Sequence, residues 1–260
     1  MNTSTQELVR FERRGGTALL TLNRPDARNA ISPEVSQAMA AALDEIEADK
    51  DLRVVVLTGA GDVFSAGADL KVVAQGRGME IARGKGGFAG IATRNFPKPV
   101  IAAVNGPALA GGFEIVLSCD LVVAADTAKF GIPEAKRGLM AAAGGLIRLP
   151  KRVSLAIALE LAMTGDPIDA SRALDLGLVN KVVPRARVID EACALADTIG
   201  ENSPIAVRLS RQLVREAAEL SEDDGWKRTN ELAVEIFASG DAVEGATAFA
   251  EKRRPVWKSS

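Results

Sequence analysis

The 260-residue sequence contains no histidine and no tyrosine, and its only cysteines are Cys119 and Cys193. The lack of histidine excludes Ser-His and Cys-His nucleophile pairs and any zinc site with histidine ligands. Acid or base catalysis near neutral pH would therefore need carboxylates or lysines. The two cysteines lie in apolar helical patterns, so we interpret them as buried free thiols. A disulfide framework would need more cysteines.

The sequence also lacks the features of a membrane, secreted or nucleic-acid-binding protein. No run of about 18 apolar residues is present, which predicts no membrane span. The first residues, MNTSTQELVR, lack the basic and apolar regions of a signal peptide. The formal net charge is −2, with no dense stripe of Lys and Arg interleaved with aromatics. We expect a cytoplasmic protein with no membrane or nucleic-acid partner.

Apolar β-branched runs alternate with helical patterns along the chain, which favours an α/β fold. The predicted strands are 17–23, 53–59, 99–106, 120–126 and 178–184. Ser32 and Pro33 are typical of a helix N-terminus, and a helix is predicted to follow them. Further helices are expected at 154–164, 170–176, 187–200, 204–219, 222–238 and 241–252. The glycine-rich residues 74–90 are predicted to form a mobile loop or a broken helix.

Two segments, 54–70 and 100–115, repeat the same order of features: an apolar strand, a glycine, a short turn, and an Ala-Gly pair that opens a helix. Any strand-to-helix turn needs small residues, so each segment alone has a structural explanation. Together they suggest a second interpretation, in which each directs a backbone N–H at the same point. Helix N-termini stabilise developing negative charge.

Glu114 is the one glutamate within the apolar stretch NGPALAGGFEIVLSCD, residues 105–120, and lies in its middle. Its neighbours Phe113, Ile115 and Val116 leave no obvious face for solvent. Burying an unpaired charge is costly, which favours a chemical role for Glu114. A helix that starts near Gly111 would place its carboxylate beside the free N–H groups of that helix start.

Glu134, in AKFGIPEAKRGL (128–139), is a second candidate carboxylate with a good structural explanation. Pro133 suits the first position of a helix, and an acidic residue beside it is favoured by the helix dipole. On its own, Glu134 is therefore interpreted as structural.

Six segments, in order and spacing, resemble the crotonase (enoyl-CoA hydratase/isomerase) superfamily over nearly the whole chain. They are LTLNRPDARNAIS (20–32), FSAGADLK (64–71), NGPALAGGFEIVLSCD, AKFGIPEAKRGL, MTGDPIDASRALDLGLVNKVV (163–183) and FAEKRRPVW (249–257). The resemblance implies an α/β fold in which a crotonase-like spiral of ββα units occupies residues 1–200. It also implies a C-terminal helical region, residues 201–260, that forms a homotrimer or a dimer of trimers.

The resemblance also implies an active site. The backbone N–H groups of Ala68 and Gly111 match the oxyanion-hole donors, and Glu114 and Glu134 match the two catalytic glutamates of the hydratases. Residues implied to contact CoA are Arg28, Ala66, Ala68, Asp69, Leu70, Lys71 and Gly111, with Phe249 and Lys252 approaching the CoA of a neighbouring subunit. CoA would arrive as part of the acyl-CoA substrate, and no metal or other cofactor is implied.

With both glutamates present, the implied activity is that of a hydro-lyase, an enoyl-CoA hydratase that adds water to a 2-enoyl-CoA. We assign Glu114 as the base and Glu134 as the proton donor, and expect one carboxyl to have a raised pKa. Many hydratases of the family carry Pro-Gly-x-Gly-Gly where this chain has AAAGG, residues 141–145. Alternatives are a carnitinyl-CoA dehydratase-like enzyme on a branched or functionalised acyl-CoA, a Δ3-Δ2 isomerase, a non-catalytic acyl-CoA-binding scaffold and an RNA binder.

Overall fold

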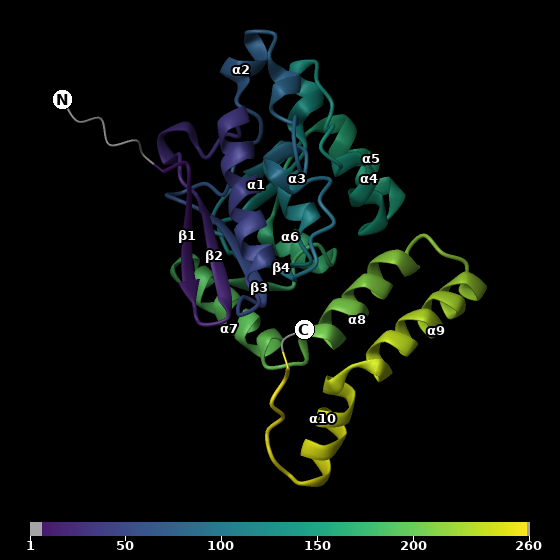
Figure 1. Ribbon diagram of the computed structural model, residues 1–260. Helices are drawn as coiled ribbons and strands as arrows, with labels where there is room; N and C mark the ends of the chain where they lie inside the picture. Colours follow the sequence, from purple (N-terminus) through teal and green to yellow (C-terminus); the bar gives the residue numbers. More distant parts are fainter. Residues whose placement is uncertain (1–6, 259–260) are drawn as a thin grey trace, which may run out of the picture.

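The computed structural model describes residues 7–258. Its main sheet has the strand order β1-β2-β3-β4-β6-β9, in which the β1–β2 hairpin is antiparallel and the other pairs are parallel (Figure 1). The strands are β1 (Val9–Arg14), β2 (Thr17–Leu22), β3 (Val54–Gly59), β4 (Val100–Val104), β6 (Leu121–Ala125) and β9 (Lys181–Val183). Strands β3 and β4 are buried along their whole length, which explains their continuous apolar sequence.

A second, smaller sheet has the order β5-β7-β8 and lies next to the candidate site. Its strands are β5 (Ala108–Leu109), β7 (Lys129–Gly131) and β8 (Ile168–Asp169). Strand β5 leads directly into helix α3 (Gly111–Ser118), and β7 leads into the 3-10 turn η4 (Pro133–Arg137). The parallel pairing of β5 with β7 therefore brings the segment that carries Glu114 alongside the segment that carries Glu134.

Helix α1 (Pro33–Ala48) begins as its sequence predicts. The Ser32 hydroxyl accepts a hydrogen bond from the Val35 N–H, and an apolar stripe that includes Met39 and Leu43 is buried. Helix α7 (Val188–Gly200) packs across the main sheet. The remaining helices are α2 (Leu70–Ala74), α4 (Gly145–Arg148), α5 (Leu155–Thr164), α6 (Ala170–Asp175), α8 (Pro204–Ala217), α9 (Glu222–Ala238) and α10 (Gly240–Ala250).

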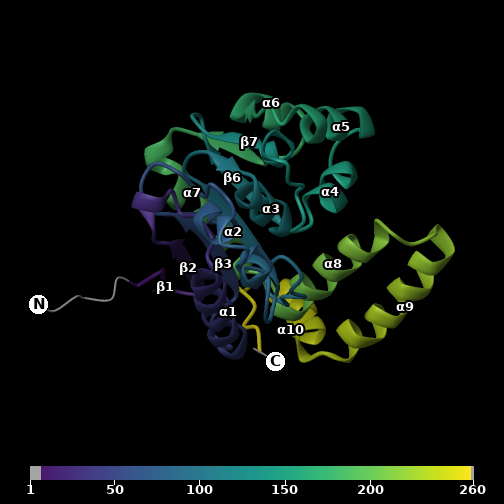
Figure 2. The ribbon, with the colours of Figure 1, turned by 90° about the horizontal axis from the view of Figure 1, so that it is seen from above.

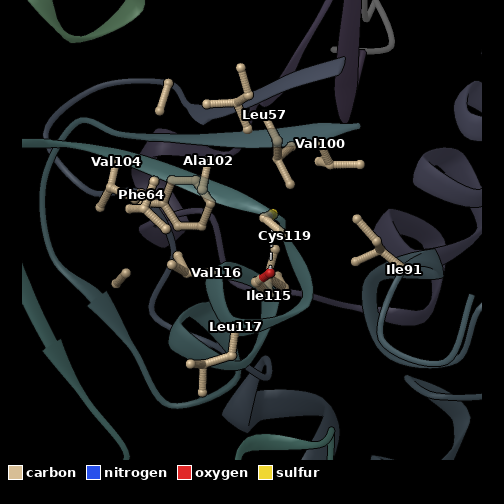
Figure 3. Close-up of a cluster of buried hydrophobic side chains, with 14 of the residues drawn as sticks. Leu57, Phe64, Ile91, Val100, Ala102, Val104, Ile115, Val116, Leu117 and Cys119 are labelled. Carbon is tan, nitrogen blue, oxygen red and sulfur yellow. Dashed lines mark hydrogen bonds between the residues drawn. The ribbon is translucent and has the colours of Figure 1, made fainter. Parts of the chain in front are cut away.

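The main hydrophobic core fills the space between the sheet and helix α3. Figure 3 shows part of this core, with Leu57 of β3, Ala102 of β4, Val116 of α3 and the ring of Phe64 in one cluster. Cys119 is fully buried there, and its thiol donates a hydrogen bond to the Ile115 carbonyl at 3.3 Å. Burial raises the pKa of Cys119 to about 12, so this thiol stays protonated. Cys193, predicted to be buried as well, is only half-buried because its helix α7 lies at the surface.

The C-terminal helices extend away from the rest of the chain, as Figures 1 and 2 show. Helices α8 and α9 form an antiparallel pair with its own small core of Ile205, Leu209 and Leu232. Large apolar side chains on α9 and α10 remain exposed, including Trp226 and Phe237. The C-terminal helices therefore leave part of their apolar surface exposed within one chain.

The predicted strands and helices are all present, with small shifts at their ends. Prediction missed β1 because its alternating charged residues hide the strand signal, and it missed β5, β7 and β8 because they are only two or three residues long. Residues 74–90 form a broken helix that includes the 3-10 turns η2 (Gly78–Glu80) and η3 (Phe88–Gly90). Within residues 7–258, no helix has the length and apolar character to cross a membrane.

Candidate active site

The two repeated strand-to-helix segments lie against each other. Ser65 and Ala108 form a parallel bridge between them, and a Cβ atom on Gly67 would lie 2.6 Å from the backbone nitrogen of Gly111. The turns after β3 and β4 are thus in direct backbone contact. This contact requires glycine at 67, whose φ of +87° also suits glycine.

The backbone N–H of Ala68 is held in place by hydrogen bonds on both sides of this residue. The Ile31 N–H donates to the Gly67 carbonyl at 2.8 Å, and the Asp69 N–H donates to the Ile31 carbonyl at 2.9 Å. Among residues 7–258, neither the Ala68 N–H nor the Gly111 N–H donates a hydrogen bond to a protein acceptor. The turn before Gly111 is strained, because Ala110 has φ 54° and ψ −132°.

Phe88 is a site residue that sequence reasoning missed. It is buried, and a Cβ atom on Gly111 would overlap its ring, so the ring lies directly against the Gly111 backbone. The turn that carries Phe88 is fixed by the Ala89 N–H, which donates to the Ser36 hydroxyl of α1 at 3.1 Å. Only the order of glycines around Phe88 hinted that this segment folds back on itself.

Glu114 lies in the first turn of α3 and is only 3% exposed. Its Oε1 accepts hydrogen bonds from the N–H groups of Ala143, at 2.7 Å, and Gly145, at 2.8 Å. The expectation that the free N–H groups at the start of α3 lie beside this carboxylate is wrong, because the donors come from the start of α4. The reason is geometric: the side chain extends outward from its own helix and reaches the neighbouring segment.

Burial raises the pKa of Glu114, while the N–H groups of Gly145 and Ala143 and the charge of Arg148 act in the opposite direction. These donors favour the ionised form, so they allow a carboxylate to exist in an apolar segment. The chain's AAAGG stretch thus acts through its backbone at Ala143 and Gly145.

Glu134 lies in η4 directly after Pro133, as its structural interpretation predicts, and it is 9% exposed. Its Oε2 is buried and has no hydrogen-bond partner among residues 7–258. Burial, together with the nearby charge of Glu114, raises the pKa of Glu134 to about 7. The expected raised pKa therefore falls mainly on Glu134, which lacks the backbone donors that support Glu114.

The predicted CoA contacts of the N-terminal half gather beside this site. The Ala66 N–H donates to the Arg28 carbonyl at 3.0 Å, and Asp69 accepts from the guanidinium of Arg24 at 3.1 Å. Asp69 also caps α2 by accepting from the Lys71 N–H. One continuous edge is therefore formed by residues 24–31 and 66–71. It includes both Ala68 and Leu70.

Phe249 and Lys252 are not brought to this edge within one chain. Phe249 lies on α10, at the end of the C-terminal helices, and is 87% exposed, while Lys252 lies two residues beyond the end of α10. Figure 1 shows α10 and α2 at opposite ends of the molecule. Any contact of these two residues with CoA would have to involve a second chain.

Metal ligands do not gather anywhere in residues 7–258 as a group of three or more His, Cys, Asp or Glu side chains. The arrangement at the site is instead one of two buried carboxylates near a pair of backbone donors. Such an arrangement can stabilise an oxyanion and transfer protons.

Comparisons with known proteins show the family of this chain. The family model for enoyl-CoA hydratase/isomerase matches residues 12–260. A carnitinyl-CoA dehydratase of Citrobacter koseri is 42% identical over 258 residues, which cover 97% of this chain and 98% of that protein. An enoyl-CoA hydratase of Mycobacterium tuberculosis is 42% identical over 249 residues, 94% of each chain.

Solved structures resemble the whole chain. The crystal structure of an enoyl-CoA hydratase from Mycobacterium tuberculosis has a TM-score of 0.93 at 45% identity and covers 98% of this chain and 100% of that one. That of a carnitinyl-CoA hydratase from Mycobacterium avium has a TM-score of 0.78 at 45% identity, with the same coverage. The chain belongs to the enoyl-CoA hydratase/isomerase family, has the crotonase fold and is a hydro-lyase.

Proposed function

We propose that this protein adds water across the 2,3 double bond of a 2-enoyl-CoA thioester to give a 3-hydroxyacyl-CoA. The observation that supports this most strongly is the buried pair of Glu114 and Glu134, in which the charge of Glu114 raises the pKa of Glu134. They lie on segments that the small sheet brings side by side, next to the contact between Gly67 and Gly111.

In this mechanism the N–H groups of Ala68 and Gly111 bind the thioester oxygen. As water adds at C3, negative charge develops on that oxygen as an enolate-like species. Donors that are already fixed need no rearrangement to stabilise this charge, and loss of one such donor typically costs about 3–4 kcal/mol. The anchoring of Ala68 through Ile31 and the strained turn at Ala110 support this rigidity.

Glu114 acts as the base and Glu134 as the proton donor. The backbone donors at Ala143 and Gly145 favour the ionised form of Glu114, as a base requires. The pKa of about 7 keeps much of Glu134 protonated near neutral pH. Water loses a proton to Glu114 while its oxygen bonds to C3, and C2 takes the proton of Glu134. Proton exchange with solvent then restores both carboxyl groups.

The CoA portion would bind along the edge formed by residues 24–31 and 66–71, with contacts from Arg28, Ala66, Asp69, Leu70 and Lys71. Phe249 and Lys252 would contribute from a neighbouring subunit. We further propose that residues 1–200 form the catalytic core and residues 201–260 the oligomerisation region of a homotrimer or a dimer of trimers. The exposed apolar side chains of α9 and α10 support this division.

A second candidate is hydration or dehydration of a functionalised acyl-CoA. It is supported by the 42% identity to a carnitinyl-CoA dehydratase, which equals the identity to an enoyl-CoA hydratase. Both candidates use the same two glutamates and differ in the acyl group.

The deciding experiment follows loss of enoyl absorbance with crotonyl-CoA, longer 2-enoyl-CoAs and crotonobetainyl-CoA. Glu114→Gln and Glu134→Gln should each lower kcat by about 100-fold or more while acyl-CoA binding persists. Glu219→Gln, which changes an exposed carboxylate paired with Lys151, is the matched control. Near-full turnover by either active-site variant would contradict the paired-acid mechanism, and no turnover on any substrate would favour a binding scaffold.

A further inference from the structure

Arg148 is the last residue of α4, and its side chain is half-buried beneath the active site. One guanidinium nitrogen, Nη1, donates to the Ala143 carbonyl at 3.3 Å, and the other, Nη2, donates to the Ala92 carbonyl. The two carbonyls belong to segments that are far apart in sequence. A planar guanidinium suits such a bridge because its donors diverge in fixed directions.

Ala143 is held on both sides. Its carbonyl accepts from Arg148, and its N–H donates to Glu114 Oε1 at 2.7 Å. Gly144 has φ +104°, and a Cβ atom there would overlap the Arg148 guanidinium, so the guanidinium packs directly on this turn. Displacement of Arg148 would therefore shift Ala143, and with it the N–H that donates to Glu114.

The Ala92 side of the bridge reaches the other part of the site. Ala92 follows the turn that carries Phe88, and the Ala92 N–H donates to the Phe88 carbonyl at 3.1 Å. The ring of Phe88 covers the Gly111 backbone. Arg148 thus connects the support of the catalytic carboxylate with the packing around one oxyanion donor.

We propose that Arg148 is a positioning residue of the active site. Through Ala143 it fixes the carboxylate of Glu114, and through Ala92 it fixes the turn that carries Phe88. This inference rests on the proposed hydration mechanism and extends it to a residue that touches neither the substrate nor the reacting water.

The charge of Arg148 acts in the same direction as its hydrogen bonds, since it lowers the pKa of Glu114. Arg148 from α4 lowers the pKa of Glu114, Glu114 raises the pKa of Glu134 from η4, and Arg215 from α8 lowers the pKa of Arg148. Loss of Arg148 should therefore move the acid limb of kcat/KM to higher pH. A purely structural residue would leave that limb in place.

The neighbouring Arg152 shows the contrast. Its guanidinium donates to the carbonyls of Leu117 and Cys119, at the end of α3, and it contacts neither Glu114 nor Ala143. Arg152 therefore stabilises the end of α3, whereas Arg148 stabilises the turn whose N–H groups donate to the catalytic carboxylate.

The test compares Arg148→Met and Arg148→Lys with Lys151→Met, which removes an exposed charge three residues away. Arg148→Met should lower kcat about 10- to 100-fold, as expected for a misplaced catalytic group, with a smaller change in KM. It should also move the acid limb of the kcat/KM profile to higher pH and speed amide hydrogen exchange in the peptide of residues 140–147. Arg148→Lys should keep the acid limb near its original pH, because the positive charge is retained. It should still lose turnover, because an ammonium group cannot bridge the Ala143 and Ala92 carbonyls as the guanidinium does.

Wild-type kcat in Arg148→Met, or the same losses in Lys151→Met, would overturn the proposal. If Arg148→Met does not fold, Arg148→Lys decides, because wild-type kcat in that variant would equally overturn it. Absence of turnover in the wild type would contradict the proposed function instead. The exchange rate of the 140–147 peptide in the free protein still tests the positioning role in that case, and unchanged protection without Arg148 would refute it.

Discussion

Glu114 Oε1 accepts a hydrogen bond from the Gly145 N–H at 2.8 Å across a sequence separation of 31 residues. A Cβ atom on Gly145 would lie 3.0 Å from both Cγ and Oε1 of the same glutamate. The backbone at position 145 thus supports the carboxylate and leaves no space for a side chain beside it.

Gly145→Ala should therefore push the Glu114 carboxylate out of place and lower kcat by about 10-fold or more, since small displacements of a catalytic group cost about 10²-fold. The φ of Gly145 lies outside the left-handed region, so backbone strain does not complicate the result. Steady-state kinetics on crotonyl-CoA measure the effect. Gly200→Ala, where a Cβ has nothing within 4 Å, is the control and should match the wild type.

Glu134→Gln should stabilise the protein at alkaline pH. The folded pKa of about 7 lies above the ordinary 4.5, so between these values the folded state binds more protons than the unfolded state and stability falls as pH rises. The penalty is absent below pH 4.5 and complete above pH 7, where it amounts to at most about 3 kcal/mol. Denaturant unfolding at pH 5 and pH 8 should show a gain for Glu134→Gln that is larger at pH 8. An equal gain at both values would contradict the raised pKa.

Asp69→Ala should weaken the edge proposed to bind CoA and loosen Ala68 beside it. The carboxylate caps α2 and pairs with Arg24 while only 13% of its side chain is exposed. Loss of the cap alone costs about 1 kcal/mol. We expect a higher KM and a lower kcat, with partial retention in Asp69→Asn, which keeps an acceptor. Glu80→Ala, which removes an exposed ion pair, should leave both constants unchanged.

Phe249→Ala tests whether a neighbouring subunit completes the CoA site. Because Phe249 is 87% exposed in one chain, truncation should change the stability of that chain by no more than about 0.5 kcal/mol. KM for acyl-CoA should nevertheless rise several-fold, with kcat less affected. Kinetics and sedimentation on the same samples separate loss of the contact from loss of assembly. A wild-type KM in an intact oligomer would show that Phe249 makes no useful contact with CoA.

Much of this protein could be predicted from its sequence. The alternation of strands and helices, the start of α1 at Ser32 and the family resemblance follow from local patterns, because burial periodicity and capping act over a few residues. The lack of histidine directed attention to carboxylates, and the apolar surroundings of Glu114 marked it as unusual. These inferences need no knowledge of which segments meet.

The tertiary structure alone decided which groups support those carboxylates. Glu114 is held by Ala143 and Gly145 because the small sheet and α4 bring that turn to it, and no local pattern encodes such a contact. The same long-range packing places Phe88 on Gly111 and Arg148 beneath Ala143. The burial that raises the pKa of Glu134, and that leaves its Oε2 without a hydrogen-bond partner among residues 7–258, is likewise a property of the folded chain.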